Sequence, residues 1–567
     1  MRDSTLACQQ QVRSEAAATR VGLASPPSYA ILGAITLFAF AVRVYQLDHQ
    51  SLWFDEGFAA YAALRPSVLD LLQFLVREDV HPPLHYLILQ AWVRFAGHSE
   101  FALRYVSVIA GTLSIPLIAR LGACLFDKRL GYLAAALLAV SPFHIWYSQE
   151  ARMYALVCLL AIASVSLYLK CQSGAGWKTV LAYVAISAAL LLSHYYGLFV
   201  LLFENMAFLA ALVIGRQRSL SLRKWLAIQG LIAGLCSPWL FGFASQVQRG
   251  TLGPQGFVAL WSMLQKVSIA FSVGDEPAPV PYLSQVIGAP ASSIGPLHWV
   301  FLLVLLLGVG LGLWRATRWR RQTRTRSRRP WPIRVSFLPD GKSPIGGCGS
   351  GVAFTLFYLA NAPVAALLVT VALSKNIRAE SDKYYMVIFP AYLLLLAYSI
   401  CSLARHSRAS GLLVGGLLFA VLFVATAGQA VARQKEEYRS VASYVMKREL
   451  PNEVIVLNPG YLHFVFDLYY HGVLQWRSAE SGDEGAVDAS LESTTAGYEG
   501  AWLIVRRDEA IDPKSIVKAW FDERGLLLDE QWFVGPECYI TPLSPAPISG
   551  FLLCPTRSTP YSPARSG

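Results

Sequence analysis

Apolar stretches long enough to cross a lipid bilayer recur along the chain, and they limit its possible folds more than any other feature of the sequence. The hydrocarbon core of a bilayer is about 30 Å thick, so a helix needs about 20 mostly apolar residues to span it. Hydrophobic residues make up 55% of the chain and charged residues only 15%, with a mean hydropathy of +0.44. This composition excludes a cytosolic enzyme or a disordered scaffold. We predict a polytopic α-helical membrane protein with about 11 transmembrane helices, at residues 29–46, 101–121, 130–146, 153–169, 179–193, 197–214, 225–243, 297–314, 351–373, 384–404 and 410–430.

The positive charge of the chain follows this topology. Lys and Arg number 48 against 36 Asp and Glu, which gives a net charge of +12 and a pI near 9.2. With the N-terminus inside, the inside loops carry 20 basic residues and the longer outside loops carry 9, as the positive-inside rule requires. The densest cluster lies in the basic cytoplasmic loop 315–350, which we interpret as a topology determinant near anionic lipid. The sequence therefore predicts an integral membrane protein without a nucleic-acid partner.

The chain divides into three parts by composition. Residues 1–28 are polar and predict a cytoplasmic N-terminal tail that is not an ordinary signal peptide, so that the first span would target the chain. Residues 29–430 form the predicted transmembrane module. Charged residues become frequent again in 431–567. Because the N-terminus is predicted to lie inside, an odd number of spans places this last part on the outer side of the membrane.

The last part has the pattern of a small α/β extracytoplasmic domain. Helical spacing runs over Gln434–Glu449, and buried-strand patterns occur at Glu453–Leu457 and Ala501–Val505. Cys538 and Cys554 both lie in this part. A disulfide between them is one possibility in an oxidising compartment, and two free thiols are the other.

The first outer loop, residues 48–100, contains an unusual acid pair. Asp55 and Glu56 stand side by side among aromatic residues, directly after a span ends. Burial near the membrane raises the pKa of a carboxylate and makes it a better base, unless a cation pairs with it; a solvated pair of acids is the alternative. Further along, His81 comes before two prolines and an apolar stretch. This order predicts a helix lying on the membrane, with His81 as an entry or cap residue.

Polar groups also collect in the other outer loops. Charges at membrane depth are costly, so they usually face a cavity or one another, although an ordinary interfacial ion pair is an alternative. An acid beside several cations suits sugar transfer from a lipid phosphate, because the acceptor hydroxyl needs a base and the departing phosphate needs cations. The sequence has no Asp-x-Asp motif, no phosphate-binding glycine loop and no zinc-type spacing. The candidates in these loops are Glu150, Arg152, Tyr154, His194, Tyr195, Arg378 and Lys383.

Three peptides together resemble a known family. Leu52–Glu56, His81–Leu84 and Trp146–Tyr154 are similar to motifs of the bacterial branch of glycosyltransferase family 39. That branch resembles the protein O-mannosyltransferases and the lipid A aminoarabinose transferases, all of the GT-C fold. The resemblance implies a sugar donor linked to polyprenyl or dolichyl phosphate, inversion at the anomeric carbon and a location in the bacterial inner membrane.

The resemblance also implies roles for individual residues. Asp55 would be the general base that activates the acceptor, and Glu56 would help to position Asp55 or would bind the acceptor. His81, together with Arg152 and Glu150, would line the pocket for the donor phosphate. No cofactor is implied: an adjacent acid pair can hold a divalent cation, but much of the resembled family works without one.

Further substrate-binding candidates come from position on the predicted outer face. Tyr154 ends the third of the three peptides, and His194 and Tyr195 belong to a weaker resemblance to the family. Arg378 and Lys383 are chosen as phosphate contacts by charge and by their predicted face. Around these two cations the chain departs from the family, in which a simpler Arg-Tyr pair usually precedes the last spans. The choice between Arg378 and Lys383 therefore stays open.

The leading hypothesis is a membrane glycosyltransferase that moves a sugar from a polyprenyl-phosphate donor to an acceptor on the outer face. The sugar is mannose, an arabinose derivative, glucose or galactose, and the acceptor is a protein, a lipid or a glycan. A transporter or flippase of lipid-linked sugars is the first alternative, since many spans with charged residues also suit transport. A non-catalytic membrane assembly partner is the second.

Overall fold

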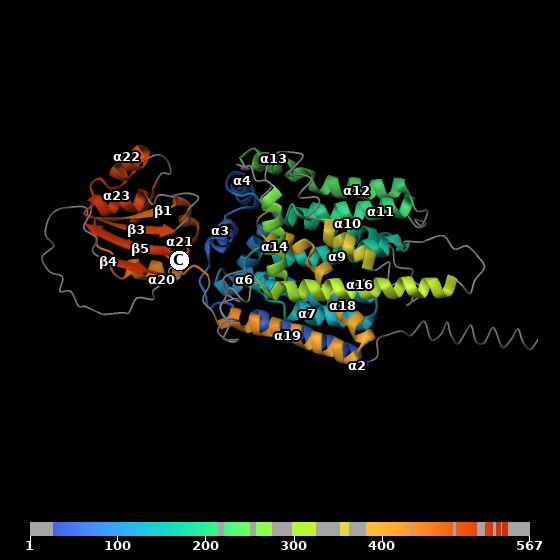
Figure 1. Cartoon of the computed structure of the whole chain (residues 1–567). Coiled ribbons are helices and arrows are strands. Elements are labelled where there is room, and N and C mark those ends of the chain that lie inside the picture. Colours follow the sequence, from blue (N-terminus) through green and yellow to red (C-terminus); the bar gives the residue numbers. More distant parts are fainter. Residues whose placement is uncertain are drawn as a thin grey trace, which may run out of the picture. The chain divides into compact units, whose positions relative to one another are not determined.

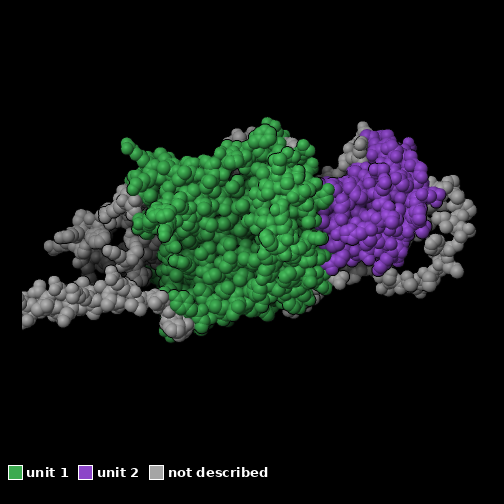
Figure 2. Space-filling model, turned by 180° about the vertical axis from the view of Figure 1, so that it is seen from behind, with its two compact units in different colours: residues 1–435 green, residues 436–567 purple. Residues whose placement is uncertain are grey.

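The computed structural model divides the chain into two compact units, Met1–Lys435 and Glu436–Gly567 (Figure 2). The sequence places the corresponding boundary at residue 431. The residues that the structure describes are 26–213, 220–249, 257–274, 297–324, 352–361, 382–431, 435–479, 484–506, 516–524, 529–533 and 536–542.

The described part of the first unit is helical, and its long helices run side by side (Figure 1). One hydrophobic core joins them, with members from the first helix to the last. The helices are α2 (Pro26–Val44), α3 (Phe54–Ala63), α4 (Val68–Glu78), α5 (Leu84–Ala96), α6 (Glu100–Leu125), α7 (Lys128–Ala139), α8 (Pro142–Ser148), α9 (Tyr154–Gln172), α10 (Trp177–Ser193), α11 (Gly197–Val213), α12 (Leu222–Cys236), η1 (Ser237–Trp239), α13 (Leu240–Arg249), α14 (Phe257–Val273), α16 (Leu297–Arg324), η3 (Asp382–Val387), α18 (Phe389–His406) and α19 (Arg408–Val431).

Several of these helices are long and apolar enough to cross a membrane. Among the described residues there are 4 such helices, or up to 5 if the bent pair α7–α8 counts as one span. Shorter apolar helices of 10–17 residues accompany them. The chain is an integral membrane protein, and the count of about 11 spans stays a prediction. The 4 spans are Glu100–Leu125, Tyr154–Gln172, Leu222–Gln248 and Arg408–Ala430.

The helix pair α7–α8 bends by 62°, although the sequence predicts one continuous span at 130–146. Pro142 begins the second helix, and the Ser141 hydroxyl caps it by accepting from the His144 amide at 3.3 Å. Proline lacks the N–H that would continue α7, so carbonyls at its end need other donors. The fully buried Arg43 supplies them, since its guanidinium donates to the carbonyl oxygens of Leu138 and Ala139 at 3.1 and 3.3 Å.

This bend matters because α8 leads directly into residues 149–153, the connection to α9. The three short helices α3, α4 and α5 follow α2, and α3 and α4 lie toward one end of the bundle (Figure 1). Helix α4 begins at a serine N-cap, where the Ser67 hydroxyl accepts from the Asp70 amide at 3.1 Å. Helix α5 begins at Leu84, directly after the two prolines.

The second unit contains a five-stranded mixed sheet in the order β2-β1-β3-β5-β4. Strand β1 pairs in parallel with β2 and β3, whereas β5 pairs antiparallel with β3 and β4. The elements are α20 (Tyr438–Met446), β1 (Glu453–Asn458), η4 (Gly460–Leu462), α21 (His463–Phe466), β2 (Gln475–Ser478), α22 (Glu484–Thr495), β3 (Gly500–Arg506), α23 (Ile516–Arg524), β4 (Asp529–Trp532) and β5 (Pro536–Pro542).

Both faces of the two central strands are covered. Val454 and Leu503 point into a core that includes residues of α22 and α23. Trp502, which directly precedes Leu503 in β3, contacts Tyr444 of α20 at a ring distance of 6.0 Å. Strands buried on both faces explain why β1 and β3 read as continuous apolar runs. The backbone of Cys538 lies in β5, while its side chain and the whole of Cys554 lie outside the described residues, so the disulfide stays a prediction.

Candidate active site

The acid pair occupies the first turn of α3. Trp53 is the N-cap, and Asp55 and Glu56 follow within the first turn, where the helix dipole favours negative charge. Successive residues of a helix point about 100° apart. The two carboxylates therefore enter different surroundings.

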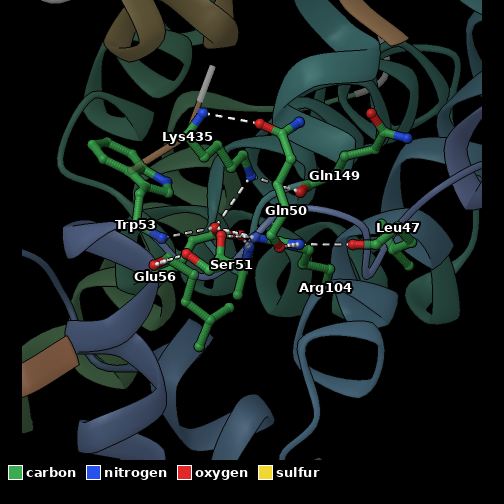
Figure 3. A network of polar contacts seen from close by, with 10 residues as sticks. Leu47, Gln50, Ser51, Trp53, Glu56, Arg104, Gln149 and Lys435 are labelled. Atoms are coloured by element: carbon green, nitrogen blue, oxygen red, sulfur yellow. Dashed lines mark hydrogen bonds and ion pairs between the residues drawn. The ribbon is translucent and has the colours of Figure 1, made fainter. Parts of the chain in front are cut away.

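Glu56 is fully buried in a closed network of donors (Figure 3). Arg104 donates to both carboxylate oxygens at 2.7 Å, Lys435 donates to Oε2 at 3.2 Å, and the amide of Ala151 donates to Oε1 at 2.9 Å. Burial alone would raise the pKa of Glu56, but Arg104 and Lys435 outweigh it and lower the pKa to about 2. Glu56 is thus an ionised group with both oxygens engaged by the protein.

The two cations of this network tie distant segments together. Arg104 also donates to the carbonyl oxygens of Leu47, Gln50 and Ser51 at 2.7 to 2.8 Å, so it fixes the chain between α2 and α3. Lys435 donates to the carbonyl oxygen of Gln149 at 3.1 Å, and its own amide donates to the side chain of Gln50 at 2.9 Å.

Asp55 faces a different and more open environment. Its Oδ2 lies 3.1 Å from Nζ of Lys383, and the two side chains are 23% and 20% exposed. Among the described residues, no side chain or amide donates to the other carboxylate oxygen. Arg152 lies alongside, because its Nη1 approaches the carbonyl oxygen of Asp55 at 3.4 Å and donates to the hydroxyl of Tyr86 at 2.9 Å. Burial would raise the pKa of Asp55, but Lys383 and Arg152 hold it well below its usual range.

Aromatic and imidazole rings surround Lys383 and extend away from it. The ammonium lies 5.4 Å from the ring centre of Trp53 and 5.5 Å from that of Tyr154. Beyond them, the ring of Tyr384 lies 6.5 Å from Tyr154 and 5.0 Å from His194. Charged ammonium groups are attracted to ring faces at such distances. The rings of Trp53, Tyr154, Tyr384 and His194 thus form one continuous wall beside Lys383.

His81 joins the same wall from the first outer loop. Its ring lies 5.6 Å from that of His194, and its Nδ1 lies 3.0 Å from Oδ1 of Asp79. Burial lowers the pKa of both histidines, that of His194 well below its usual value. Both imidazoles are therefore neutral near pH 7. In His194 the amide of Tyr196 donates to Nδ1 at 3.1 Å, which leaves the proton on Nε2.

Four buried polar atoms in this wall have no hydrogen-bond partner among the described residues. Buried polar groups nearly always have one, so each exception needs an explanation. All four are donors, counting the neutral form of His194, and they surround the pair of Asp55 and Lys383. A ligand rich in acceptor oxygens is the chemistry that would satisfy them. The atoms are Nε1 of Trp53, Nε of Arg152, the hydroxyl of Tyr154 and Nε2 of His194.

Glu150 is the remaining acid near the site. It is buried, one of its carboxylate oxygens has no partner among the described residues, and it interacts electrostatically with Lys435, Glu56, Lys383 and Asp55. Burial, the largest effect, raises the pKa of Glu150 to about 7. It therefore changes its charge within the physiological pH range.

The structure brings most of the sequence candidates together. Asp55, His81, Arg152, Tyr154, His194 and Lys383 line one site. Tyr195 turns away from it: the Tyr195 hydroxyl accepts from Trp239 at 3.0 Å, and its ring packs on Phe243. Its hydroxyl is linked to the site through Gln246, which also donates to the carbonyl oxygen of His81 at 3.2 Å. Arg378 lies outside the described residues.

Sequence reasoning missed four residues of this site. Arg104 lies within the predicted span 101–121, and a charge inside an apolar span was a signal that it faces a polar partner. No local sequence pattern distinguishes Tyr86 or Tyr384 as a site residue, apart from the candidate residues that lie beside them in the sequence. Lys435 likewise has no such pattern, since it lies in a charged segment after the last span.

No three His, Cys, Asp or Glu side chains within the described ranges lie close enough together to hold a metal ion. The carboxylate of Glu56 is occupied by cations of the protein, and that of Asp55 faces Lys383. The charges on this site are thus balanced by Lys and Arg, and anion binding is the chemistry that its free donors favour.

Part of the chain is similar to a known protein family. Residues 80–241 match the family described as dolichyl-phosphate-mannose-protein mannosyltransferase. The family match confirms the resemblance. The matched segment includes His81, Arg152 and His194 and begins after the acid pair of α3. No curated protein sequence matches the chain.

Several solved structures are similar to most of the chain at low identity. The Archaeoglobus fulgidus oligosaccharyltransferase shares 10% identity at a TM-score of 0.49, over 90% of this chain and 72% of that one. ArnT from Cupriavidus metallidurans bound to undecaprenyl phosphate shares 15% at 0.45, over 92% and 99%. The mycobacterial arabinofuranosyltransferase AftD shares 13% at 0.46, over 91% and 40%. The proposal below rests on the family match and on the geometry of the site.

Proposed function

We propose that the protein is a GT-C type membrane glycosyltransferase that transfers a sugar from a polyprenyl-phosphate donor to an acceptor hydroxyl. Asp55 is the general base. The observation that carries the proposal is the arrangement around this residue. Counting contacts among the described residues, it has a carboxylate with one unengaged oxygen, two cations beside it, and four buried donors without partners. Transfer from a lipid phosphate needs these groups together, in a membrane protein.

The reaction is a single displacement at the anomeric carbon. The acceptor oxygen attacks this carbon, its proton goes to Asp55, and the bond from the carbon to the phosphate oxygen breaks. The lipid phosphate leaves with one more negative charge than it had in the donor. Lys383 and Arg152 are the cations that stabilise this charge, and displacement inverts the anomeric configuration.

The aromatic wall binds the sugar and orients it. Tyr154 and Trp53 present ring faces and unpartnered donors, and His194 presents an N–H from a neutral ring. Sugar hydroxyls accept hydrogen bonds while the apolar ring face packs on aromatic rings. His81 holds the wall in place through its contact with Asp79.

Glu56 is a positioning residue in this proposal. Its oxygens are engaged by Arg104, Lys435 and Ala151, so it fixes the first turn of α3 and thereby aims Asp55. Of the two roles that the family resemblance implies for Glu56, these contacts support the positioning of Asp55. Holding the base in place increases the reaction rate, because even a small displacement of a catalytic group lowers that rate strongly.

The topology completes the proposal. Residues 1–28 lie in the cytoplasm, the module 29–430 carries the site toward the outer side of the bacterial inner membrane, and residues 431–567 lie outside it. The positive-inside count and the apolar helices support this orientation. The donor is a polyprenyl-phosphate-linked sugar in the outer leaflet, and the acceptor is a glycan, lipid or protein there.

Transfer by an Asp55→Asn variant tests the proposal. The full-length protein is reconstituted with radiolabelled polyprenyl-phosphate sugar and a membrane extract as acceptor source. Removal of the base lowers transfer by about 100-fold or more, while the variant stays in the membrane. Asp70→Asn is the matched control, because Asp70 is an exposed acid of α4 in the same loop, and it keeps wild-type transfer.

Two outcomes contradict the proposal. Undiminished transfer by the Asp55→Asn protein excludes this carboxylate as the base. Movement of the labelled lipid across the bilayer without any glycoconjugate shows a transporter instead.

A further inference from the structure

The ammonium group of Lys383 has two anionic partners: the carboxylate of Asp55 in the structure and the phosphate of the donor in the proposed reaction. In the structure Nζ of Lys383 lies 3.1 Å from Oδ2 of Asp55. In the reaction proposed above, the same cation stabilises the phosphate of the donor. The anion that holds the ammonium group determines how readily Asp55 accepts a proton.

An aspartate paired with lysine is a poor base. The nearby ammonium stabilises the ionised carboxylate, and the pKa of Asp55 lies well below its usual range. A general base works best when its proton affinity matches the working pH. Asp55 therefore has to lose positive charge from its neighbourhood before it can accept a proton from the acceptor hydroxyl.

We propose that Lys383 is exchanged between Asp55 and the donor phosphate. Without donor, the ammonium neutralises Asp55. When the donor binds, the ammonium moves to the phosphate and leaves a free carboxylate beside the anomeric carbon. The inference rests on the proposed function, and it makes donor binding the event that activates the base, so the donor binds before the acceptor reacts.

The contacts of Lys383 suit an exchange better than those of the other cations. Arg104 is 2% exposed and donates to five oxygens, and Arg152 is 3% exposed and held by Tyr86. Lys383 uses one of its three donor hydrogens among the described residues, on Asp55, and a fifth of its side chain is exposed. Its flexible stem carries the ammonium across the faces of Trp53 and Tyr154 without breaking another hydrogen bond.

The exchange also accounts for the end of the cycle. The transferred proton is on Asp55 after the sugar has left, and the lipid phosphate holds Lys383. When the lipid phosphate dissociates, the ammonium returns to Asp55. Its charge lowers the proton affinity of that carboxyl group, and the proton goes to solvent. The free enzyme is thereby restored with no additional reactant.

Binding of undecaprenyl phosphate to the full-length protein in nanodiscs tests the exchange. Asp55→Asn removes the competing carboxylate, so this variant binds the probe more tightly than wild type, by about fivefold. Lys383→Met removes the cation and weakens binding by about tenfold. The double variant binds like Lys383→Met alone, because Asp55 acts on the phosphate only through Lys383.

Two controls separate the exchange from general effects. Asp70→Asn leaves the affinity unchanged. Undecaprenol, which lacks the phosphate, binds wild type and Asp55→Asn equally. Thermal unfolding of each variant verifies that it is folded, and Lys383→Arg recovers part of the lost affinity. Unchanged or weaker binding by folded Asp55→Asn overturns the exchange, as does unchanged binding by Lys383→Met.

The outcome is separable from that of the transfer assay. The binding cycle measures lipid phosphate affinity without any transfer. A protein that shows the tighter binding but forms no glycoconjugate keeps the exchange and loses the proposed function. A protein that transfers sugar with the expected dependence on Asp55, yet shows no tighter binding, keeps the function and loses the exchange.

Discussion

Two neighbouring carboxylates differ because each meets a different set of cations. Glu56 is enclosed by a bidentate arginine and a lysine, whereas Asp55 meets a lysine that is partly exposed and, within the part of the chain that the structure describes, keeps one oxygen unengaged. A closed network stabilises a structure, and an open one leaves room for a substrate. The division of roles between the two acids follows from this difference.

Glu56 makes the protein sensitive to acid. Its pKa is about 2 in the folded protein and about 4.3 in an unfolded chain, so its ionised form stabilises the fold above pH 4. This contribution, about 3 kcal/mol, is lost as the pH falls from about 4 to about 2. Glu56→Gln lowers the unfolding free energy at pH 7 and removes this part of the acid transition.

Thermal unfolding across this pH range measures the effect. Glu78→Gln at the exposed end of α4 is the control. An acid transition of unchanged size in folded Glu56→Gln would show that the network does not stabilise the protein.

Glu150 gives donor binding its own pH dependence. Its pKa is raised to about 7, mainly by burial, so it is neutral below pH 7 and gains a negative charge above. That charge lies near Lys383, Lys435, Asp55 and Glu56 and disfavours a phosphate. We expect the KM for the donor to rise as the pH increases through 7, and Glu150→Gln to abolish the rise. The same rise in the variant would contradict this role.

The sequence predicted the reactive side of this site better than its support. Asp55, His81, Arg152 and Lys383 could be grouped because motifs and loop charges assign them to one face. The partners of Glu56 could not, since Arg104 and Lys435 are 48 and 379 residues away. Which of the distant cations contacts Glu56 depends on tertiary packing, and no local sequence pattern predicts that packing.

At the scale of elements, the first turn of α3 is held by three segments. Arg104 of α6 fixes the approach from α2, the amide of Ala151 comes from the α8–α9 connection, and Lys435 follows α19. Lys435 contacts two of these segments at once, through Glu56 and the carbonyl oxygen of Gln149. In the proposed mechanism it is therefore a positioning residue for Asp55.

Replacement of Lys435 tests this support. Lys435→Met loses two charged hydrogen bonds and lowers the unfolding free energy by about 1–3 kcal/mol. Its kcat for transfer falls while the KM for the donor changes little, because α3 is aimed less accurately. Lys435→Arg recovers part of kcat, and Lys447→Met, at an exposed lysine, leaves both parameters unchanged. An unaltered kcat in Lys435→Met would refute the role.

The bend between α7 and α8 shows what hydropathy overlooks. The sequence predicts one span at 130–146 because the whole stretch is apolar, whereas Ser141 and Pro142 end one helix and begin another. The buried Arg43 was a second signal, since a lone cation inside a span needs carbonyl oxygens. Capping residues and charges inside spans locate such a break more reliably than mean hydropathy.

At the scale of the whole molecule, composition and loop charge predicted a membrane unit and the side on which to look for chemistry. The structure confirms an integral membrane protein with a mostly helical unit. The count of about 11 spans remains a prediction, because 4 described helices meet the length and hydropathy of a span and others are shorter. A single apolar stretch can contain short or bent helices, and hydropathy averaged over a fixed number of residues does not show where one helix ends and the next begins.

The central claim is a displacement at the anomeric carbon of a polyprenyl-phosphate sugar, with Asp55 accepting the proton. The anomeric configuration of the product tests this claim most directly. The full-length protein is incubated with a donor of known configuration, and the linkage in the glycoconjugate is determined by nuclear magnetic resonance. A linkage inverted relative to the donor is the predicted result, and a retained linkage would contradict the mechanism.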